Sequence, residues 1–133
     1  MEQTLALIKP DAVKRNIIGN IISMIENDGF VIKKMKMMRM TEQLAKEFYS
    51  VHKGKSFFDK LIGYMTSGYI VALVIEKDNA IESYRSLIGS TDPNEAEDNT
   101  IRKLYAIDKS FNSVHGSDSI ENAKIEISAI FKK

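Results

Sequence analysis

Short continuous apolar runs along the chain predict β-strands. Residues 4–9 (TLALIK) form one such run, which Pro10 stops, and residues 69–75 (YIVALVI) form the clearest one. Runs of this length without polar alternation are typical of strands that are covered on both faces. Residues 31–40 (VIKKMKMMRM) predict a further strand, and we interpret its methionines as core filler rather than as ligands of a metal.

Between these runs, apolar residues recur at the three- and four-residue spacing of a helix. Short polar side chains stand where N-caps are expected, and glycines follow some of the expected ends. The predicted helices are one that Asp11 caps, with Ile17, Ile18, Ile21, Ile22 and Ile25 on one face and Gly29 beyond its end; one from Thr41 to about Val51; one over 57–65; one that Asp78 caps, with Ile81, Tyr84, Leu87 and Ile88 on one face and Gly89 at its end; and one from about Ser119, with Ala123, Ile127, Ile130 and Phe131 on one face.

Between Gly89 and Ser119 the periodicity is weak, apart from a helical turn predicted over 100–105. Long irregular segments in compact domains are usually functional. Strands and helices interleave without a regular helix for every strand. This order favours an α/β (α+β) sandwich in which helices pack on an antiparallel sheet.

The composition narrows the class of protein. A chain of 133 residues is long enough for one compact domain, residues 1–133, and too short for two ordinary ones. A net charge of +1 offers no broad positive field for nucleic acid or an anionic membrane, so any basic site must be local. The absence of cysteine excludes disulfides and thiolate metal sites. Because MEQTLALIKP has no signal-peptide pattern and no run has membrane-spanning length, we expect a cytoplasmic protein.

Several familiar site patterns do not occur in the sequence. No His or Cys cluster suits zinc, and H-E-x-x-H, G-x-S-x-G and G-x-G-x-x-G are all missing. Gly54, Lys55 and Ser56 invite a P-loop interpretation, but that motif needs a glycine where Tyr49 stands and a strand before it. Any chemistry must therefore come from side chains that the fold brings together.

His115, one of only two histidines, stands in the polar segment NSVHGSD. A neutral imidazole nitrogen can accept a phosphoryl group and pass it on, provided that a partner orients the ring. Glu126 borders the inward face of the last predicted helix and is the candidate partner. The alternative is that His115 is a turn residue without a chemical role.

Side chains suited to polyphosphate stand at predicted strand and helix ends and in the long loop. Arginine forks and lysine charges bind phosphate well, although most such residues are solvated surface charges. The candidates are Lys9, His52, Arg85, Thr91 and Arg102.

Five co-linear segments resemble the nucleoside diphosphate kinase family. They are ALIKPDAV (6–13), FYSVHKGKSFF (48–58), YRSLIGSTDP (84–93), TIRKLYA (100–106) and NSVHGSD (112–118), and together they run along essentially the whole chain. N-x-x-H-G-S-D is a highly specific signature. The resemblance implies a ferredoxin-like sandwich with a four-stranded antiparallel sheet. It also implies reversible transfer of the γ-phosphate from a nucleoside triphosphate, typically ATP, to a nucleoside diphosphate by a ping-pong route.

The resemblance further implies residue roles, a cofactor and an assembly. Stacking of the base on one aromatic ring predicts low base selectivity, because every base offers a π-face. Mg²⁺ is expected to arrive on the nucleotide phosphates rather than in a protein cage. A homo-oligomer, tetramer or hexamer, is implied, with no membrane or specific nucleic-acid partner. The implied roles are His115 as phosphorylated nucleophile, Glu126 as its orienting partner, Tyr49 beside it, Lys9 and Asn112 on the sugar 3′-hydroxyl with Lys9 also near the transferred phosphate, His52, Arg85, Thr91 and Arg102 on the phosphates, and Phe57 under the base.

The chain departs from the usual family residues at three loop positions. Asn99 stands where glycine is usual, Ser56 where proline precedes the paired phenylalanines, and Tyr69 where proline commonly follows Ser-Gly. None of these side chains is implied in the chemistry, so they bear on loop geometry alone. Lys109 aligns with the residue on the far side of the base from Phe57.

Two other classes of function remain open on the sequence. A ferredoxin-like domain could bind nucleotide or nucleic acid without catalysis, which a basic sheet face with paired exposed aromatics would favour. An inactive relative that serves only in assembly would lack some of the implied residues. A binding module has no reason to pair His115 with Glu126 beside Lys9, Tyr49 and Asn112, and all of these residues are present.

Overall fold

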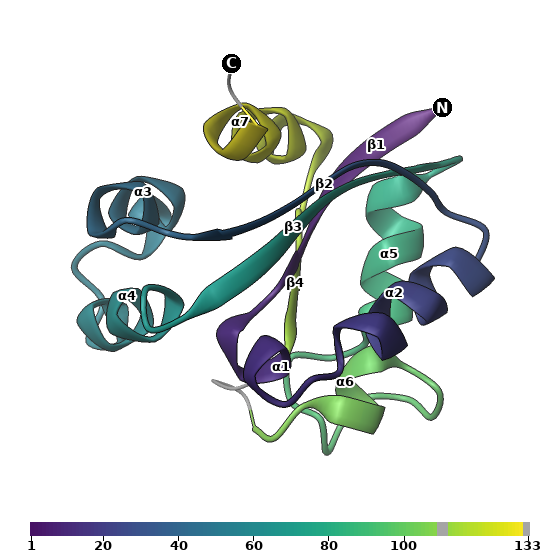
Figure 1. Ribbon diagram of the computed structural model, residues 1–133, viewed down its shortest axis with the longest axis horizontal. Helices are drawn as coiled ribbons and strands as arrows, with labels where there is room; N and C mark the ends of the chain where they lie inside the picture. Colours follow the sequence, from purple (N-terminus) through teal and green to yellow (C-terminus); the bar gives the residue numbers. More distant parts are fainter. Residues whose placement is uncertain (109–111, 132–133) are drawn as a thin grey trace.

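The fold is built on one antiparallel sheet (Figure 1). The computed structural model describes residues 1–108 and 112–131. Its strands β1 (Glu2–Ile8), β2 (Val31–Arg39), β3 (Tyr69–Lys77) and β4 (Val114–Gly116) pair in the order β2-β3-β1-β4, and every pairing is antiparallel. The expected four-stranded antiparallel sheet with helices packed on it is confirmed.

Helices cover both faces of the sheet, because the central strand β1 is apolar on both sides. Successive side chains of a strand point to opposite faces, so Ala6 and Ile8 enter one buried cluster while Leu5 and Leu7 enter the other. The first cluster is completed by α1 (Pro10–Lys14), α2 (Ile18–Asn27), α5 (Ala80–Ile88) and α6 (Ile101–Tyr105), and the second by α3 (Glu42–Phe48), α4 (Phe58–Met65) and α7 (Ile120–Phe131).

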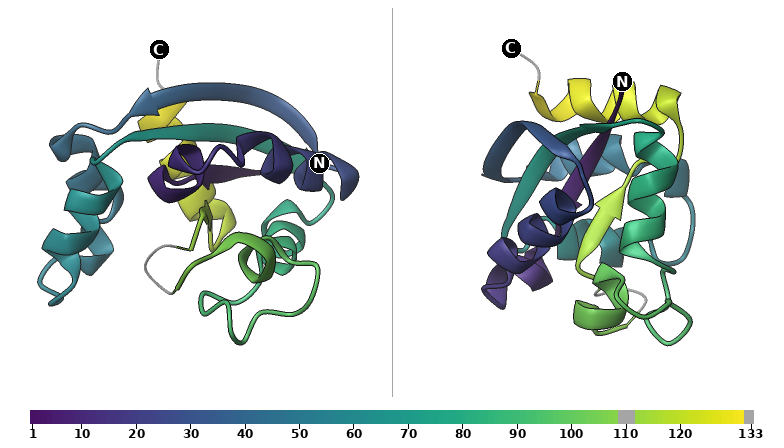
Figure 2. Two further views of the ribbon diagram at one scale, coloured as in Figure 1. Left: turned by 60° about the horizontal axis from the view of Figure 1, so that its bottom comes forward. Right: turned by 90° about the vertical axis from the view of Figure 1, so that its right-hand side faces the viewer.

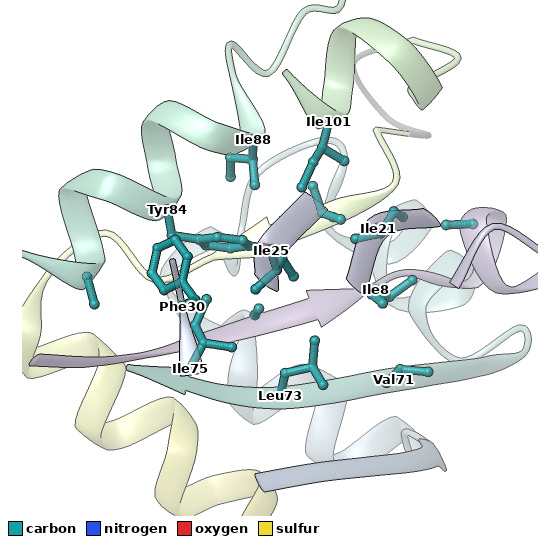
Figure 3. Packing of buried hydrophobic residues seen from close by; sticks show 14 residues of the cluster. Ile8, Ile21, Ile25, Phe30, Val71, Leu73, Ile75, Tyr84, Ile88 and Ile101 are labelled. Atoms are coloured by element: carbon teal, nitrogen blue, oxygen red, sulfur yellow. The ribbon is translucent and has the colours of Figure 1, made fainter. Parts of the chain in front are cut away.

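The two clusters have different helix arrangements. In the first, Tyr84 of α5 meets Phe30 edge to face, with ring centroids 6.0 Å apart (Figure 3). In the second, α3 and α4 lie side by side at one end of the sheet, joined through the short 3-10 helix η1 (Ser50–His52) (Figures 1 and 2). The α3–η1–α4 segment therefore projects from the sheet as a hairpin of helices.

Several element predictions are confirmed. The Thr41 hydroxyl accepts the Leu44 N–H at 3.0 Å and caps α3, as expected. The stretches 57–65, 69–75 and 100–105 correspond to α4, β3 and α6, and the last helix begins directly after Ser119. Where a polar side chain and the apolar periodicity agree, the sequence locates the element.

Two predicted caps are wrong. The helix expected to begin at Asp11 is split into α1 and α2 around Asn16, whose φ is 60°, and the Asp11 side chain is buried rather than capping. Asp78 does not cap α5; instead the Glu2 carboxylate accepts the Ile81 N–H at 2.8 Å. Both outcomes depend on residues far away in sequence, which a local pattern cannot reveal.

The edge strand β2 corrects another interpretation. Met35 and Met37 are 61% and 56% exposed, so they are not core filler, although Met40 is buried. The reason is that β2 pairs only with β3 and carries these two side chains on an uncovered face. Within the described part of the chain, no helix is long and apolar enough to cross a membrane.

Candidate active site

His115 lies in the middle of β4, beside the end of β1. The antiparallel register pairs His115 with Leu7 and Val114 with Ile8. Since neighbouring side chains alternate, Val114 enters the first cluster while the His115 ring turns to the other face. There it meets Phe48 and Tyr49 of the α3 end, with ring centroids 5.3 and 6.4 Å away.

Glu126 of α7 holds the His115 ring from one side. Its Oε1 lies 3.0 Å from His115 Nε2 and also accepts the Ser117 hydroxyl at 2.7 Å. The two side chains are 20% and 16% exposed, so the contact is only partly open to water. With Nε2–H donating to the carboxylate, the Nδ1 lone pair is left available for another partner.

Lys9 and Asn112 form a buried pair next to the histidine strand. Lys9 Nζ donates to Asn112 Oδ1 at 2.8 Å, and the Lys9 N–H donates to the Ser113 carbonyl at 2.9 Å. Burial, reinforced by the nearby Arg102 charge and opposed by Asp11, lowers the pKa of Lys9 to about 8. A lysine placed in this way is a cation whose charge becomes costly when it has no anionic partner.

Arg102 of α6 binds the backbone at the end of α5 and in β4. Its guanidinium donates to the Gly89 carbonyl at 3.1 Å and to the Val114 carbonyl at 2.9 Å. Its buried Nε has no protein partner, and burial together with the nearby Arg85 charge lowers the pKa of Arg102. Arg85 itself is exposed on α5, and Thr91 is exposed in the segment between α5 and α6.

The α3–η1–α4 hairpin carries aromatic and imidazole rings that lie next to one another and next to the His115 ring. Tyr49 stacks near His52 with centroids 6.5 Å apart, and His52 lies 5.3 Å from Phe57, which is 46% exposed. The Tyr49 hydroxyl and His52 Nδ1 are buried without a hydrogen-bond partner among residues 1–108 and 112–131. Burial and the Glu126 charge raise the pKa of Tyr49, whereas burial and Lys55 lower the pKa of His52.

The structure thus joins most of the candidate residues through contacts. One group links His115, Glu126, Tyr49, His52 and Phe57, and a second links Lys9 with Asn112. Arg102 is related to both groups, because it binds the carbonyl of Val114, directly before His115, and because its charge acts on Lys9. Arg85 lies close enough to influence Arg102 electrostatically, Thr91 has no hydrogen bond to the other candidates, and Lys109 lies outside the described residues.

Some contact residues had no sequence signal of their own. Phe48 packs on the His115 ring although its position in the sequence resembles that of any helix-end aromatic. Ser113 adopts φ 72° in a tight turn that the Val114 N–H closes on the Asn112 carbonyl at 2.8 Å. Of these residues, Ser117 alone occupies a fixed position of the N-x-x-H-G-S-D signature, in which Ser113 fills a variable one.

The three loop departures have local explanations. Asn99 has φ 68°, a conformation that glycine adopts freely and that asparagine tolerates better than most other residues. Tyr69 opens β3 opposite Arg39, whose guanidinium lies 5.7 Å from the ring centroid. Ser56 is exposed between η1 and α4. None of these residues disrupts the elements that carry the site.

Solved structures share this architecture throughout its length. A nucleoside diphosphate kinase from Aquifex aeolicus superposes with a TM-score of 0.96 at 43% identity, over 98% of this chain and 95% of that one. One from Halobacterium salinarum, solved in complex with CDP, gives a TM-score of 0.95 at 39% identity over 99% and 88% of the two chains. The fold and its histidine-bearing strand therefore place the chain among phosphotransferases.

Sequence comparison gives the same family. The family model described as nucleoside diphosphate kinase matches residues 2–133. Nucleoside diphosphate kinases of Histophilus somni (strain 2336) and Saccharolobus islandicus are 53% and 50% identical, over 98% and 100% of this chain and 93% and 96% of theirs. The chain belongs to the nucleoside diphosphate kinase family.

Proposed function

We propose that this chain transfers the γ-phosphate of a nucleoside triphosphate, typically ATP, to a nucleoside diphosphate in two steps through a phosphohistidine on His115. The observation that carries the proposal is the His115–Glu126 contact, which engages Nε2 and leaves Nδ1 as the nucleophile. Glu126 then favours the imidazolium character that develops as the N–P bond forms.

Each half of the reaction is a displacement at phosphorus. The Nδ1 lone pair forms a bond to Pγ, the bond between Pγ and the bridging oxygen breaks, and that oxygen leaves with the electron pair as part of the nucleoside diphosphate. After exchange of the nucleotide, an oxygen of the acceptor's β-phosphate attacks the same phosphorus and the N–P bond breaks. Such a transfer needs positioning and charge neutralisation more than acid–base chemistry.

The phosphates would lie where the buried donors have no protein partner. Tyr49 Oη, His52 Nδ1 and Arg102 Nε are such atoms, and leaving buried polar groups unpaired is costly. A polyphosphate would supply acceptors to the Tyr49 hydroxyl, to an Nδ1–H of neutral His52 and to the Arg102 guanidinium, with Arg85 and Thr91 at its exposed end. The high pKa of Tyr49 keeps its hydroxyl protonated as a donor.

The nucleoside would extend from the phosphates toward the surface. The hydrogen-bonded pair Lys9 and Asn112 would contact the 3′-hydroxyl, and the exposed Phe57 ring would offer a stacking surface for the base. Stacking without contacts to the base edges supports low base selectivity. The CDP complex of the Halobacterium salinarum relative is consistent with a nucleotide ligand.

The described residues contain no group of three or more His, Cys, Asp or Glu side chains that could hold a metal ion. The proposed phosphate contacts Lys9, Arg85 and Arg102 are cationic, which suits phosphates rather than a metal. We therefore propose that Mg²⁺ is bound mainly by the nucleotide phosphates, whose charge it neutralises.

The proposal extends to the organisation of the protein. The family match over residues 2–133 supports one kinase domain spanning residues 1–133. The uncovered edge strand β2 supports a homo-oligomer, a tetramer or hexamer, and the cysteine-free composition suits the cytoplasm.

The test is to mix the protein with γ-labelled ATP and Mg²⁺ without an acceptor. We expect label on the protein that survives base and is lost in acid, and that moves to GDP with formation of GTP. His115→Ala should take up no label, while an exposed-site variant such as Ile125→Ala should label normally. A wild-type protein that binds nucleotide but never becomes labelled would refute the two-step route.

Low base selectivity is tested with the same labelled protein. Equal concentrations of ADP, GDP, CDP and UDP should discharge the label at rates within about one order of magnitude of each other, because stacking discriminates weakly between bases. A strong preference for one nucleoside diphosphate would count against stacking on Phe57 as the main contact to the base.

A further inference from the structure

Asp11 is a buried carboxylate whose two oxygens bind different segments of the chain. Its Oδ1 accepts the Tyr64 hydroxyl of α4, and the same hydroxyl accepts the Asp11 N–H at 3.3 Å. Its Oδ2 accepts the Ser113 hydroxyl at 3.1 Å and lies 3.8 Å from Arg15 Nη1. The side chain is only 5% exposed, so these contacts replace its hydration.

The three segments joined in this way each carry part of the proposed site. Asp11 follows Lys9 by two residues and lies in the first turn of α1. Ser113 lies between Asn112 and β4, and Tyr64 belongs to α4, the second helix of the α3–η1–α4 hairpin. No residue assigned above to the reaction makes all three connections.

The Ser113 turn requires such support. Its φ of 72° is unfavourable for a residue other than glycine and persists only when surrounding contacts hold it. Two backbone bonds and the Asp11 carboxylate provide those contacts. Since Asn112 precedes the turn directly, a shift of Ser113 would move the Asn112 amide relative to Lys9 Nζ.

We propose that Asp11 and Tyr64 are positioning residues that keep the Lys9–Asn112 pair aligned for the 3′-hydroxyl of the nucleotide. The inference rests on the proposed function, and neither residue is expected to touch the substrate. Tyr64 orients the carboxylate from α4, and the carboxylate in turn fixes Ser113 and the backbone that carries Asn112.

This role predicts that variants of these positioning residues lose activity to an extent that depends on the substrate. A general structural defect would lower activity toward every nucleotide equally. A misaligned Lys9–Asn112 pair would instead lower activity toward nucleotides that have a 3′-hydroxyl more than activity toward 2′,3′-dideoxynucleotides, which cannot use that contact.

The experiment compares GDP with 2′,3′-dideoxy-GDP as acceptors, with ATP as donor, in the full-length wild-type protein and in Tyr64→Phe. We expect the ratio of the two kcat/KM values to fall about three- to tenfold in Tyr64→Phe, the size expected for weakening one hydrogen bond. Activity toward the dideoxy substrate should change much less. Tyr105→Phe is the matched control, because its hydroxyl lies on an exposed surface and, among the described residues, accepts a hydrogen bond only from the Asn20 amide, at 3.4 Å.

A second variant keeps the proposal falsifiable if Tyr64→Phe folds poorly, as monitored by circular dichroism. Ser113→Ala removes the other partner of Asp11 and should lower the same ratio, and the double variant should lose less than the two single losses combined. Equal losses with both substrates, or an unchanged ratio in both variants, would overturn the proposal. A wild-type protein that phosphorylates neither acceptor would instead refute the proposed function.

Discussion

At the residue scale, an aromatic ring packs against the backbone that carries His115, on the face of β4 opposite the imidazole. A Cβ built on Gly116 would lie 2.7 Å from Tyr84 Cδ2, and Tyr84 is completely buried, so its ring has no room to withdraw. Gly116 therefore allows β4 to approach α5 closely. His115, the proposed nucleophile, is therefore held in place by packing on the opposite face of its own strand.

Gly116→Ala is accordingly expected to lower the free energy of unfolding by about 1–3 kcal/mol, the usual cost of overpacking a core. It should also reduce phosphorylation of His115, because β4 must move away from Tyr84. Chemical denaturation and the labelling assay measure the two effects.

Gly63→Ala provides the control for that substitution. Gly63 lies in α4 with open space around its Cβ position, so this variant should gain about 0.5–1 kcal/mol from helix propensity. If both variants changed stability alike, the close approach of Tyr84 would not be the cause.

Lys9 gives a prediction about pH. Because its pKa is lowered to about 8, kcat/KM should fall above that pH as the free enzyme loses the Lys9 charge. Lys9→Arg should be less active but should lack this alkaline decline, since arginine stays protonated. A decline that persists unchanged in Lys9→Arg would assign it to another group.

Rising pH should increase the contribution of Lys9 to stability, whereas it lowers the activity. Between about 8 and the ordinary value of 10.5, the unfolded chain keeps the Lys9 proton that the folded protein has released. The contribution of Lys9 to the free energy of unfolding therefore rises with pH across this interval and is least favourable below it. Alkaline loss of activity without loss of stability would separate titration of Lys9 from denaturation.

At the scale of elements, α5 is held at its start by a residue from the first strand. Asn79 stands before the helix with φ 54° and no side-chain cap, while the Glu2 carboxylate accepts the Ile81 N–H. An acidic acceptor at a helix N-terminus satisfies an otherwise unpaired N–H and complements the helix dipole. This contact links the N-terminal strand to the helix that carries Arg85.

Glu2→Ala should therefore cost about 1 kcal/mol of stability, the usual effect of losing a helix cap. Glu2→Gln keeps an acceptor oxygen and should retain most of that contribution. Thermal unfolding of the two variants beside the wild type checks the prediction, and an unchanged midpoint for Glu2→Ala would contradict it.

The helices and strands also differ in how far the sequence could reveal them. Apolar periodicity located β1, β3 and most helices, and the Thr41 cap is local enough to be recognised. The caps on α1 and α5 were assigned wrongly because Asp11 and Glu2 act on partners more than 50 residues away. The three-residue strand β4 has too short a pattern to be predicted, so the sequence did not reveal the place of His115 in the sheet; the family resemblance implied four strands without locating the fourth.

At the scale of the whole molecule, β2 leaves one edge of the sheet uncovered. Val31, Met35 and Met37 are each more than half exposed along this strand. Unpaired backbone groups beside apolar side chains favour association with another chain, and the proposed homo-oligomer would use such an edge. The wild type should therefore sediment as a species well above the 15.0 kDa of one chain.

Met35→Lys combined with Met37→Lys should shift that species toward the monomer, because charged side chains oppose pairing at a sheet edge. Ile125→Lys, on the exposed face of α7, is the matched control and should leave the assembly intact. Sedimentation of the double variant at the wild-type position would exclude this edge as the contact between subunits.

Because β4 is pleated, the number of residues in this segment constrains the site more than the identity of those residues does. Val114 and Gly116 pack on one side while His115 points to the other. Inserting or deleting one residue between the Ser113 turn and Gly116 would exchange these directions and point the imidazole into the first buried cluster. The protein can thus accept changed loop residues at Asn99 or Ser56, whereas deletion of one residue beside His115 would turn this proposed nucleophile away from the site while leaving the histidine in the sequence.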